Sequence, residues 1–239
     1  KLLDDKHTKA TFFTLGWVAE RYPQMVRRIV AEGHELASHG YGHQRASDLT
    51  EAEFFHDVSH AKTLLEDIGG RAVQGYRAPS FSIDQRTPWA HEILAEQGYA
   101  YSSSVAPIKH DHYGWAAAPR FAFRPVTGSN FVEIPVTTVE LGPKRLAAGG
   151  GGFFRILPYA FSKWAVRKVN VHDGRPAIIY FHPWEIDPGQ PRVANAPLKS
   201  KLRHYTRLND MADKLRRLTG DFQWERLDTI AVLEQARLS

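Results

Sequence analysis

Cysteine is absent from this chain of 239 residues. Its absence excludes disulfide bonds, thiolate metal ligands and a cysteine nucleophile, so any bound metal ion must be held by histidine, aspartate or glutamate. The chain has 12 histidines and 26 acidic residues to serve as such ligands. The redox compartment in which the protein works is left open.

A long uninterrupted apolar run is also missing. The most apolar region, residues 146–164, contains four consecutive glycines, Arg155 and Pro158, whereas a membrane span needs roughly 20 apolar residues. We therefore expect no membrane span, and no signal peptide is visible. The sequence begins KLLDDKH, without a methionine. We expect that its natural start, with any targeting segment, lies upstream.

The net charge is small. The 31 Lys and Arg residues exceed the 26 Asp and Glu residues by 5, spread along the chain, which favours acidic partners only weakly. Because no nucleic-acid-binding motif accompanies this charge, we expect no nucleic-acid partner. The proportions of 43% hydrophobic and 24% charged residues are those of an ordinary globular protein. They predict one domain over residues 1–239, and the oligomeric state is not specified.

Short β-branched or aromatic segments recur along the chain with helical patterns between them. They span residues 10–15, 34–39, 73–77, 99–103, 130–136, 177–182 and 222–227. Strands that alternate with helices predict βαβ units and a mainly parallel sheet, hence an α/β fold. Seven strand segments favour a (β/α) barrel over an open doubly wound sheet.

Two helices carry clear end signals. Pro23 suits the first position of a helix over residues 23–32, and Gly33 suits its C-terminal cap. Thr50 and Glu53 form the pattern of a capping box at the start of the next helix. Apolar residues recur in that helix at helical spacing and predict a buried stripe. They are Phe54, Val58, Ala61, Leu65 and Ile68.

Two of the histidines stand out because they follow a predicted strand directly. His39 and His43 lie in the segment HELASHGYGH, and glycines 40 and 42 allow the tight turn that would bring both imidazoles to one point. Ligands gather at the carboxyl ends of strands in parallel α/β folds. The pair therefore predicts a metal site. The alternative is a flexible glycine-rich loop with two incidental histidines.

Two further strand ends carry chemically useful side chains. His182 ends the apolar segment IIYFH, and Arg77 ends VQGYR, followed by Pro79. Taken alone, Arg77 would be read as a salt-bridge partner. Taken together, the strand ends predict that His39, His43, Arg77 and His182 share one site.

Other histidine groups have simpler interpretations. His56 and His60 lie four apart, but they fall opposite the apolar stripe of their helix and are expected on the surface. His110, Asp111 and His112 are adjacent, so their side chains diverge. We interpret them as part of a polar loop.

These motifs together resemble the polysaccharide deacetylases of the NodB-homology type, carbohydrate esterase family 4. SHGYGH is similar to the metal-binding H-x-x-x-H motif of the family, RAPS to its R-x-P motif and YFH to its L-x-H motif. The longer segments KATFFTLGWVAERYP, GGGFFRILPYA and HPWEIDPGQPR resemble the subgroup associated with bacterial exopolysaccharide and PEP-CTERM protein-sorting loci. The resemblance extends from about residue 8 to residue 222.

The resemblance implies a distorted (β/α) barrel that removes acetyl groups from N-acetylated sugars. It implies that His39 and His43 bind a divalent cation, usually Zn²⁺, with Co²⁺, Ni²⁺ or Mn²⁺ as alternatives. His182 would be the general acid, and Arg77 would orient the catalytic aspartate of the family. The remaining residues expected at the substrate cleft are Pro79, Ser80, Phe81, Arg155, Trp184 and Glu185. Among them, Ser80 replaces a commoner tyrosine and would offer its backbone N–H to the oxyanion.

One part of the family pattern is not found in the sequence. The family has an aspartate pair on its first strand, one a metal ligand and the other the general base, and we expect that strand to lie upstream of Lys1. Asp4 and Asp5 match the end of the family's first helix instead. Two histidines also leave a catalytic zinc site one protein ligand short of the usual three, so a carboxylate is expected from elsewhere.

The predicted function is metal-dependent removal of N-acetyl groups from a bacterial exopolysaccharide. Amide hydrolysis needs a polarised carbonyl and an activated water, which a metal ion supplies, and an acid that protonates the leaving nitrogen. One alternative is another amide or cyclic-amide hydrolase on the same scaffold, allantoinase-like in substrate. Another is a glycan-binding module without catalysis. The location of the protein in the cell is left open.

Overall fold

A computed structural model describes residues 2–110 and 113–239 of the chain. The chain divides into two compact units. We name the unit of Lys9–Pro135 and Trp224–Ser239 the sheet unit, and the unit of Val136–Gln223 with the N-terminal residues up to Thr8 the hairpin unit. The sequence predicted a single domain over residues 1–239. Whether the two units form one domain stays a prediction.

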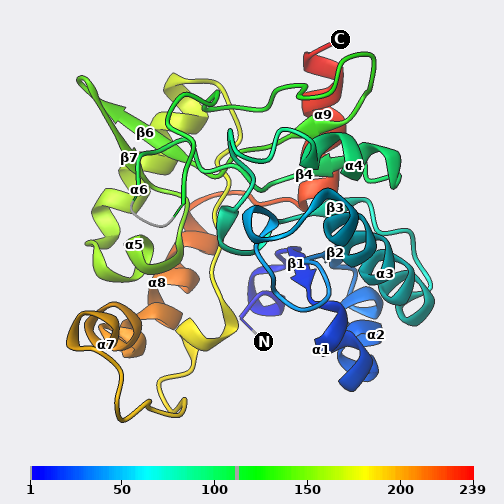
Figure 1. Cartoon of the computed structure of the whole chain (residues 1–239). Helices are drawn as coiled ribbons and strands as arrows, with labels where there is room; N and C mark the ends of the chain where they lie inside the picture. The colour runs from blue at the N-terminus through cyan, green and yellow to red at the C-terminus, as the bar shows by residue number, and fades with distance from the viewer. Residues whose placement is uncertain (1, 111–112) are drawn as a thin grey trace. The chain divides into compact units, whose positions relative to one another are not determined.

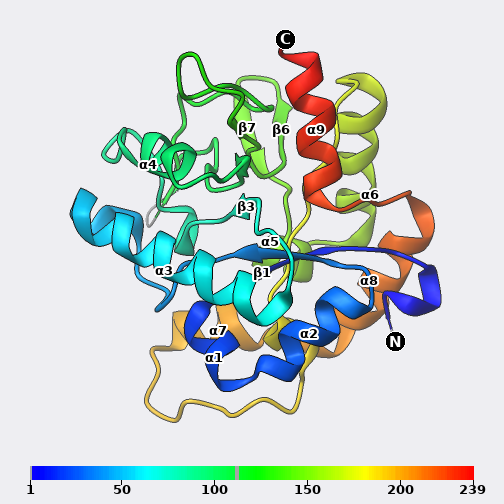
Figure 2. The same ribbon diagram turned by 90° about the vertical axis from the view of Figure 1, so that its right-hand side faces the viewer.

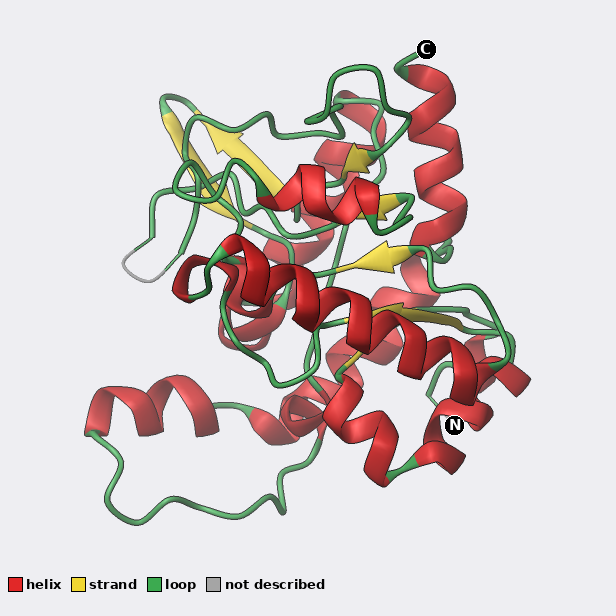
Figure 3. Ribbon diagram, turned by 45° about the vertical axis from the view of Figure 1, so that its right-hand side comes forward, coloured by secondary structure: helices red, strands yellow, loops and turns green. Residues whose placement is uncertain are grey.

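The sheet unit is built on five parallel strands in the order β1-β2-β3-β4-β5. They are β1 (Thr11–Thr14), β2 (Glu35–Ser38), β3 (Gly75–Tyr76), β4 (Tyr101–Ser102) and β5 (Val132–Glu133). Each lies inside a segment predicted as a strand. The α/β class with a parallel sheet is therefore confirmed, although the strands are shorter than predicted (Figure 3).

Helices lie between β1 and β2, between β2 and β3 and between β3 and β4 along the chain, as expected for βαβ units. The helices of the sheet unit are α1 (Gly16–Arg21), α2 (Pro23–Ala31), α3 (Glu51–Gly69), α4 (Ala90–Glu96) and α9 (Leu227–Arg237), and its 3₁₀ turns are η2 (Ala46–Asp48) and η3 (Pro79–Phe81). Helices α1, α2 and α3 lie together beside β1 and β2 (Figures 1 and 2). Helix α9 packs near β5.

The predicted helix ends are confirmed. Pro23 opens α2, and Gly33 follows its end with φ +78°, a left-handed conformation that glycine adopts without steric cost. Thr50 Oγ1 accepts the backbone N–H of Glu53, whose carboxylate accepts the N–H of Thr50 in return. This capping box starts α3.

The core of the sheet unit joins apolar side chains of the sheet with those of α1, α2, α3 and α4. The apolar stripe of α3 is buried as predicted. Its buried members are Phe54, Val58, Ala61 and Leu65, with Ile68 packed against the core. At about 1.5–3 kcal/mol for each fully buried large apolar side chain, this stripe is a main stabilising feature of the unit.

The hairpin unit contains an antiparallel pair, β6 (Thr138–Leu141) and β7 (Lys144–Ala147), that the sequence analysis did not predict. Its other elements are η1 (Asp4–Lys6), α5 (Gly151–Ile156), α6 (Tyr159–Arg167), the π-helical turn η4 (Lys168–His172), η5 (Pro183–Ile186), α7 (Leu198–Tyr205) and α8 (Leu208–Asp221). Gly142 has φ +58° in the turn of the hairpin.

Two predicted strands are wrong in their extent or existence. Within residues 177–182, all of them described, the only β-pairing is an isolated parallel bridge between Tyr180 and Gly150. Residues 222–226 are not assigned to a strand, and α9 begins at Leu227. Residues 177–182 form an apolar run and residues 222–227 an alternating pattern. A strand also needs a neighbour whose backbone groups it can pair with, and a local pattern does not report one.

Candidate functional site

The register of the parallel sheet brings the predicted site residues of the sheet unit to one edge. Ser38 of β2 pairs with Tyr76 of β3, and Tyr76 pairs with Ser102 of β4. His39 and Arg77 directly follow two of these residues. Because the strands are parallel, both lie at the carboxyl edge of the sheet, where ligands bind in α/β folds.

His39 is held by the neighbouring strand end. Its Nδ1 atom lies 2.6 Å from the carbonyl oxygen of Arg77, so Nδ1 is the protonated nitrogen that donates this hydrogen bond. In the neutral imidazole the lone pair is then on Nε2. A backbone carbonyl that fixes one ring nitrogen in this way is the usual support of a metal-binding histidine.

His43 faces His39. The two ring centroids are 5.1 Å apart with the rings at 73° to one another. The chain turns between them through Gly40, with φ +75°, and His43 itself has φ +62°, which is uncommon for a residue with a side chain. The structure therefore brings the predicted pair together, and the tight turn that the glycines were expected to allow is present.

Asp57 of α3 fixes the loop between the two histidines, and the sequence analysis did not identify it. Its Oδ1 accepts the backbone N–H of Tyr41 at 3.0 Å, and the N–H of Gly42 also donates to this carboxylate. Burial raises the pKa of Asp57, and those two hydrogen bonds oppose the rise. A Cβ atom on Gly40 would lie 2.4 Å from Asp57 Oδ2, so this position has room only for glycine.

Arg77 is buried beside β4. Its Nε donates to the carbonyl oxygen of Ser103 at 2.9 Å and its Nη2 to Ser103 Oγ at 2.7 Å. The guanidinium carbon lies 4.2 Å from the centre of the Phe13 ring. These contacts hold the guanidinium in one orientation. The predicted role of Arg77, orientation of a catalytic aspartate, stays a prediction.

The turn after Arg77 has an unusual backbone. Pro79, Ser80 and Phe81 form η3, in which Ser80 has φ 57° and ψ 24° and Phe81 has φ 50°. Two successive non-glycine residues in the left-handed region are strained, and such strain persists where the surroundings impose it, commonly at functional sites. Pro79 and Phe81 are buried. The substrate contacts predicted for these three residues stay predictions.

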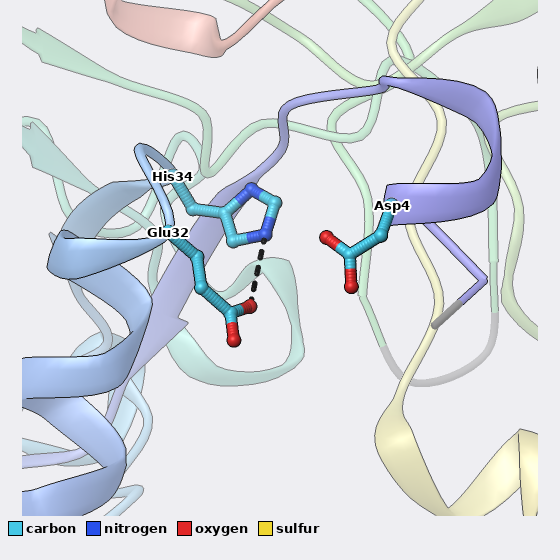
Figure 4. A group of neighbouring side chains, drawn as sticks. All are labelled: Asp4, Glu32 and His34. Carbon is cyan, nitrogen blue, oxygen red and sulfur yellow. Dashed lines mark ion pairs between the residues drawn. The ribbon is translucent and has the colours of Figure 1, made fainter.

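A third ligand does not gather with this histidine pair among residues 2–110 and 113–239. His34, at the opposite end of β2, forms a different contact: its Nε2 lies 3.8 Å from Glu32 Oε2 (Figure 4), and its Nδ1 accepts the N–H of Ala10. Asp4, also drawn there, belongs to the hairpin unit. We assign no function to the Glu32–His34 ion pair.

In the hairpin unit, His182 is tied to a buried ion pair. Its Nδ1 lies 3.2 Å from Glu185 Oε2, and its backbone N–H donates to the same oxygen at 3.0 Å. Glu185 Oε1 lies 3.2 Å from Nε of Arg155, and both of these side chains are fully buried. The side chain of His182 is half-exposed. Glu185 thus links Arg155 to His182, and the substrate contacts predicted for Arg155 and Glu185 stay predictions.

The charges in this cluster act on one another. Burial alone would raise the pKa of Glu185, but its hydrogen bonds with His182 and Arg155 outweigh burial and lower the pKa. The ionised carboxylate beside Nδ1 fixes the ring orientation of His182.

Trp184 joins His182 to a histidine that the sequence analysis overlooked. The Trp184 ring stacks on the ring of His182 at 5.4 Å and on that of His204 at 4.0 Å. His204 Nε2 lies 2.7 Å from Gln190 Oε1. Burial, and next the charge of Arg155, lower the pKa of His204. No spacing pattern marks His204 in the sequence, so only the fold identifies it.

The remaining histidine predictions have simple outcomes. His56 and His60 are exposed on α3, as predicted, and the ring of His60 packs against Tyr41 at 4.8 Å. His110 stacks on Tyr113 at 4.2 Å. Asp111 and His112 lie outside the described residues. The common site expected for His182 with His39 and His43 involves both units and stays a prediction.

Comparison with protein families agrees with the motifs at these strand ends. Residues 1–102 match the model of the polysaccharide deacetylase family. Residues 103–232, more than half of the chain, match the model of a domain of unknown function, DUF3473. Residues 1–102 thus carry a polysaccharide deacetylase domain, and the chain belongs to the family defined by the DUF3473 domain, whose model matches more than half of it.

Individual relatives support the assignment. The chain is 30% identical over 105 residues to a peptidoglycan deacetylase of Helicobacter pylori, covering 44% of this chain and 35% of the relative. The chain thus spans about a third of the length of the first curated relatives that it matches. Others are named as deacetylases of peptidoglycan N-acetylglucosamine and of chitooligosaccharides.

Solved structures share the fold along the whole chain. A protein described as a polysaccharide deacetylase from Mycobacterium smegmatis superposes with a TM-score of 0.64 at 22% identity, over 100% of this chain and 76% of its own. The Puue allantoinase superposes with the same TM-score at 16% identity, over 98% of this chain and 70% of its own. At these identities the likeness shows the fold, which is the α/β fold that the sequence resemblance implied.

Proposed function

We propose that the protein is a metal-dependent hydrolase that removes N-acetyl groups from a bacterial exopolysaccharide. The observation that carries the proposal is the paired arrangement of His39 and His43 at the carboxyl edge of the sheet, with His39 Nδ1 bound to the carbonyl oxygen of Arg77. Deacetylases of N-acetylated glycans among the named relatives support the reaction type.

The histidine pair fits a divalent cation such as Zn²⁺, for which neutral imidazole nitrogens are suitable ligands. Because Nδ1 of His39 donates a hydrogen bond, the lone pair of the ring is on Nε2, and Nε2 is the atom that would bind the ion. Such an ion, when bound, polarises the acetyl carbonyl and lowers the pKa of a bound water. His39 and His43 account for two of the usual three protein ligands, and in our proposal a carboxylate is the third.

The other residues act on the substrate in this proposal. His182, oriented by Glu185, donates a proton to the departing nitrogen of the sugar. The backbone N–H of Ser80 donates to the acetyl oxygen as negative charge develops on it, an interaction that typically contributes about 10² to 10³ in rate. Arg77, held by Ser103, orients the carboxylate base. Pro79, Phe81 and Trp184 contact the sugar.

The experiment that tests the proposal measures acetate released from N-acetylglucosamine oligomers. It uses this chain and the full product of its gene, each supplied with Zn²⁺ or treated with a chelator. We expect release by the full product that the chelator abolishes and that His39→Ala and His182→Ala each reduce at least 10²-fold. His56→Ala, a substitution of an exposed histidine, is the matched control and should leave the rate unchanged.

The rival functions predict different results. Release of ammonia or a ring-opened product from cyclic amides, without acetate from glycans, would make the protein an allantoinase-like hydrolase instead. Retained glycan binding with no hydrolysis by the full product would make it a binding module. Unchanged turnover in His39→Ala would refute the metal site.

A further inference from the structure

The segment of residues 188–209 in the hairpin unit carries charge of one sign. It contains five basic residues and no aspartate or glutamate. The basic residues are Arg192, Lys199, Lys201, Arg203 and Arg207. Their combined charge equals the formal net charge of +5 of the whole chain. We name this segment, which includes α7, the basic arm.

The basic arm also exposes large apolar side chains. Leu198 and Leu202 of α7 are 73% and 59% exposed, and Val193 in the loop before α7 is 62% exposed. Because side chains four residues apart lie on the same face of a helix, the two leucines form one apolar stripe. Exposed apolar groups that gather in one place indicate a binding surface.

Contacts within the basic arm hold the loop before α7 against the helix. The Tyr205 hydroxyl accepts the backbone N–H of Val193 at 3.0 Å, and Lys201 Nζ donates to the carbonyl oxygen of Ala194 at 2.6 Å. The guanidinium of Arg192 lies 5.1 Å from the centre of the Tyr205 ring. The loop and the helix therefore support one another, and the arm presents its leucines from a defined structure.

The C-terminal end of α7 is fixed to the body of the hairpin unit. Nη1 of the buried Arg155 donates to the carbonyl oxygens of His204 at 2.9 Å and Thr206 at 2.5 Å, and His204 stacks on Trp184. Figure 1 shows α7 at the edge of this unit, beyond α5 and α8. The anchored end leaves the exposed leucines at the periphery of the unit.

We infer that the basic arm binds the surface of an anionic lipid bilayer, with Leu198 and Leu202 inserted among the headgroups. A short helix that combines exposed leucines with lysines and arginines has the composition of interfacial helices, and basic residues are attracted to anionic lipid. An acidic glycan would use the cations but not the leucines. If a second copy of the arm were the partner, two segments of charge +5 would face one another and repel. No helix in the described part of the chain is long and apolar enough to span a membrane, so the inference concerns surface binding.

The experiment is co-sedimentation of the 239-residue chain with vesicles of phosphatidylcholine alone or with 30% phosphatidylglycerol. We expect binding to the anionic vesicles that weakens at least tenfold in the double variant Leu198→Ser/Leu202→Ser and in 0.5 M NaCl. The matched control is Val232→Ser/Leu233→Ser on α9, whose side chains are 61% and 60% exposed but belong to a helix outside the basic arm. It should bind like the unchanged chain.

Three outcomes would overturn the inference. The first is the absence of binding to anionic vesicles, and the second is equal loss of binding in the two double variants. The third is binding of soluble polygalacturonate, unaffected by Leu198→Ser/Leu202→Ser, without binding of vesicles, which would assign the arm to acidic glycans. Circular dichroism should show equal thermal unfolding of all chains, because the substituted side chains are exposed. Vesicle binding does not depend on deacetylation. The result of this experiment is therefore independent of whether the protein releases acetate.

Discussion

His39 Nδ1 lies 2.6 Å from the carbonyl oxygen of Arg77, 38 residues further along the chain. The two residues follow neighbouring parallel strands whose register aligns Ser38 with Tyr76. The acceptor is a backbone atom, so its position depends on strand pairing rather than on a particular side chain. The orientation of the imidazole is therefore a property of the sheet, which makes the edge of the sheet a rigid support for a ligand atom.

Asp57 should control metal affinity without contacting the metal. Its carboxylate holds the backbone N–H groups of Tyr41 and Gly42 between the two histidines. We expect Asp57→Asn to weaken Zn²⁺ binding about tenfold, the lower end of the range for groups that support ligands. Competition with a chromophoric chelator measures the affinity. Asp67→Asn, at an exposed position of the same helix, is the control, and equal affinity of the two variants would contradict the role of Asp57.

Gly40→Ala should destabilise the protein much more than Gly42→Ala. Gly40 has φ +75°, and an added Cβ would lie 2.4 Å from Asp57 Oδ2, whereas a Cβ on Gly42 meets nothing within 4 Å. We expect Gly40→Ala to lower the free energy of unfolding by about 1–3 kcal/mol. Urea titration followed by circular dichroism compares the two variants. Equal midpoints would show that the loop relaxes around the new methyl group.

Replacing one partner of the buried Arg155–Glu185 pair should lower the free energy of unfolding. Both side chains are fully buried with Nε and Oε1 3.2 Å apart, so Arg155→Met removes the cation beside Oε1 and leaves His182 as the partner of the buried carboxylate. We expect a loss of about 3–5 kcal/mol in the free energy of unfolding. The double variant Arg155→Met/Glu185→Leu should recover part of it, though not the hydrogen bonds of Arg155 to His204 and Thr206. A double variant less stable than Arg155→Met would contradict this account.

Glu185 should also make stability depend on pH. Its folded pKa is lowered below the ordinary value of 4.5, so the folded state favours the ionised form. The resulting stabilisation is present above about pH 4.5 and is lost as the pH falls through the folded pKa. In Glu185→Gln the free energy of unfolding should vary less between about pH 3 and pH 6 than in the unchanged chain. The exposed Glu92→Gln should keep the original slope, and a flatter slope there instead would refute the assignment.

Local patterns in the sequence account for much of the fold. Five predicted strands contain the five strands of the parallel sheet, and the capping box of Thr50 and Glu53 starts α3 where it was expected. The wrong and the missed strand predictions also came from reading local patterns alone. Residues 222–226 have the alternation of a strand but no assigned strand partner, and the hairpin of β6 and β7 has a charged, weakly apolar pattern that did not indicate strands.

The sequence by itself determined the α/β class, the placement of His39 and Arg77 at strand ends and the resemblance to a deacetylase family. Each depends on periodicity, caps or motifs confined to a few neighbouring residues. The tertiary structure alone decided that Asp57 supports the histidine loop from 16 residues away and that Arg155 binds Glu185 across 30 and the carbonyl of His204 across 49. Such contacts arise when whole elements pack, and no local pattern specifies which distant polar group will fill a given hydrogen bond.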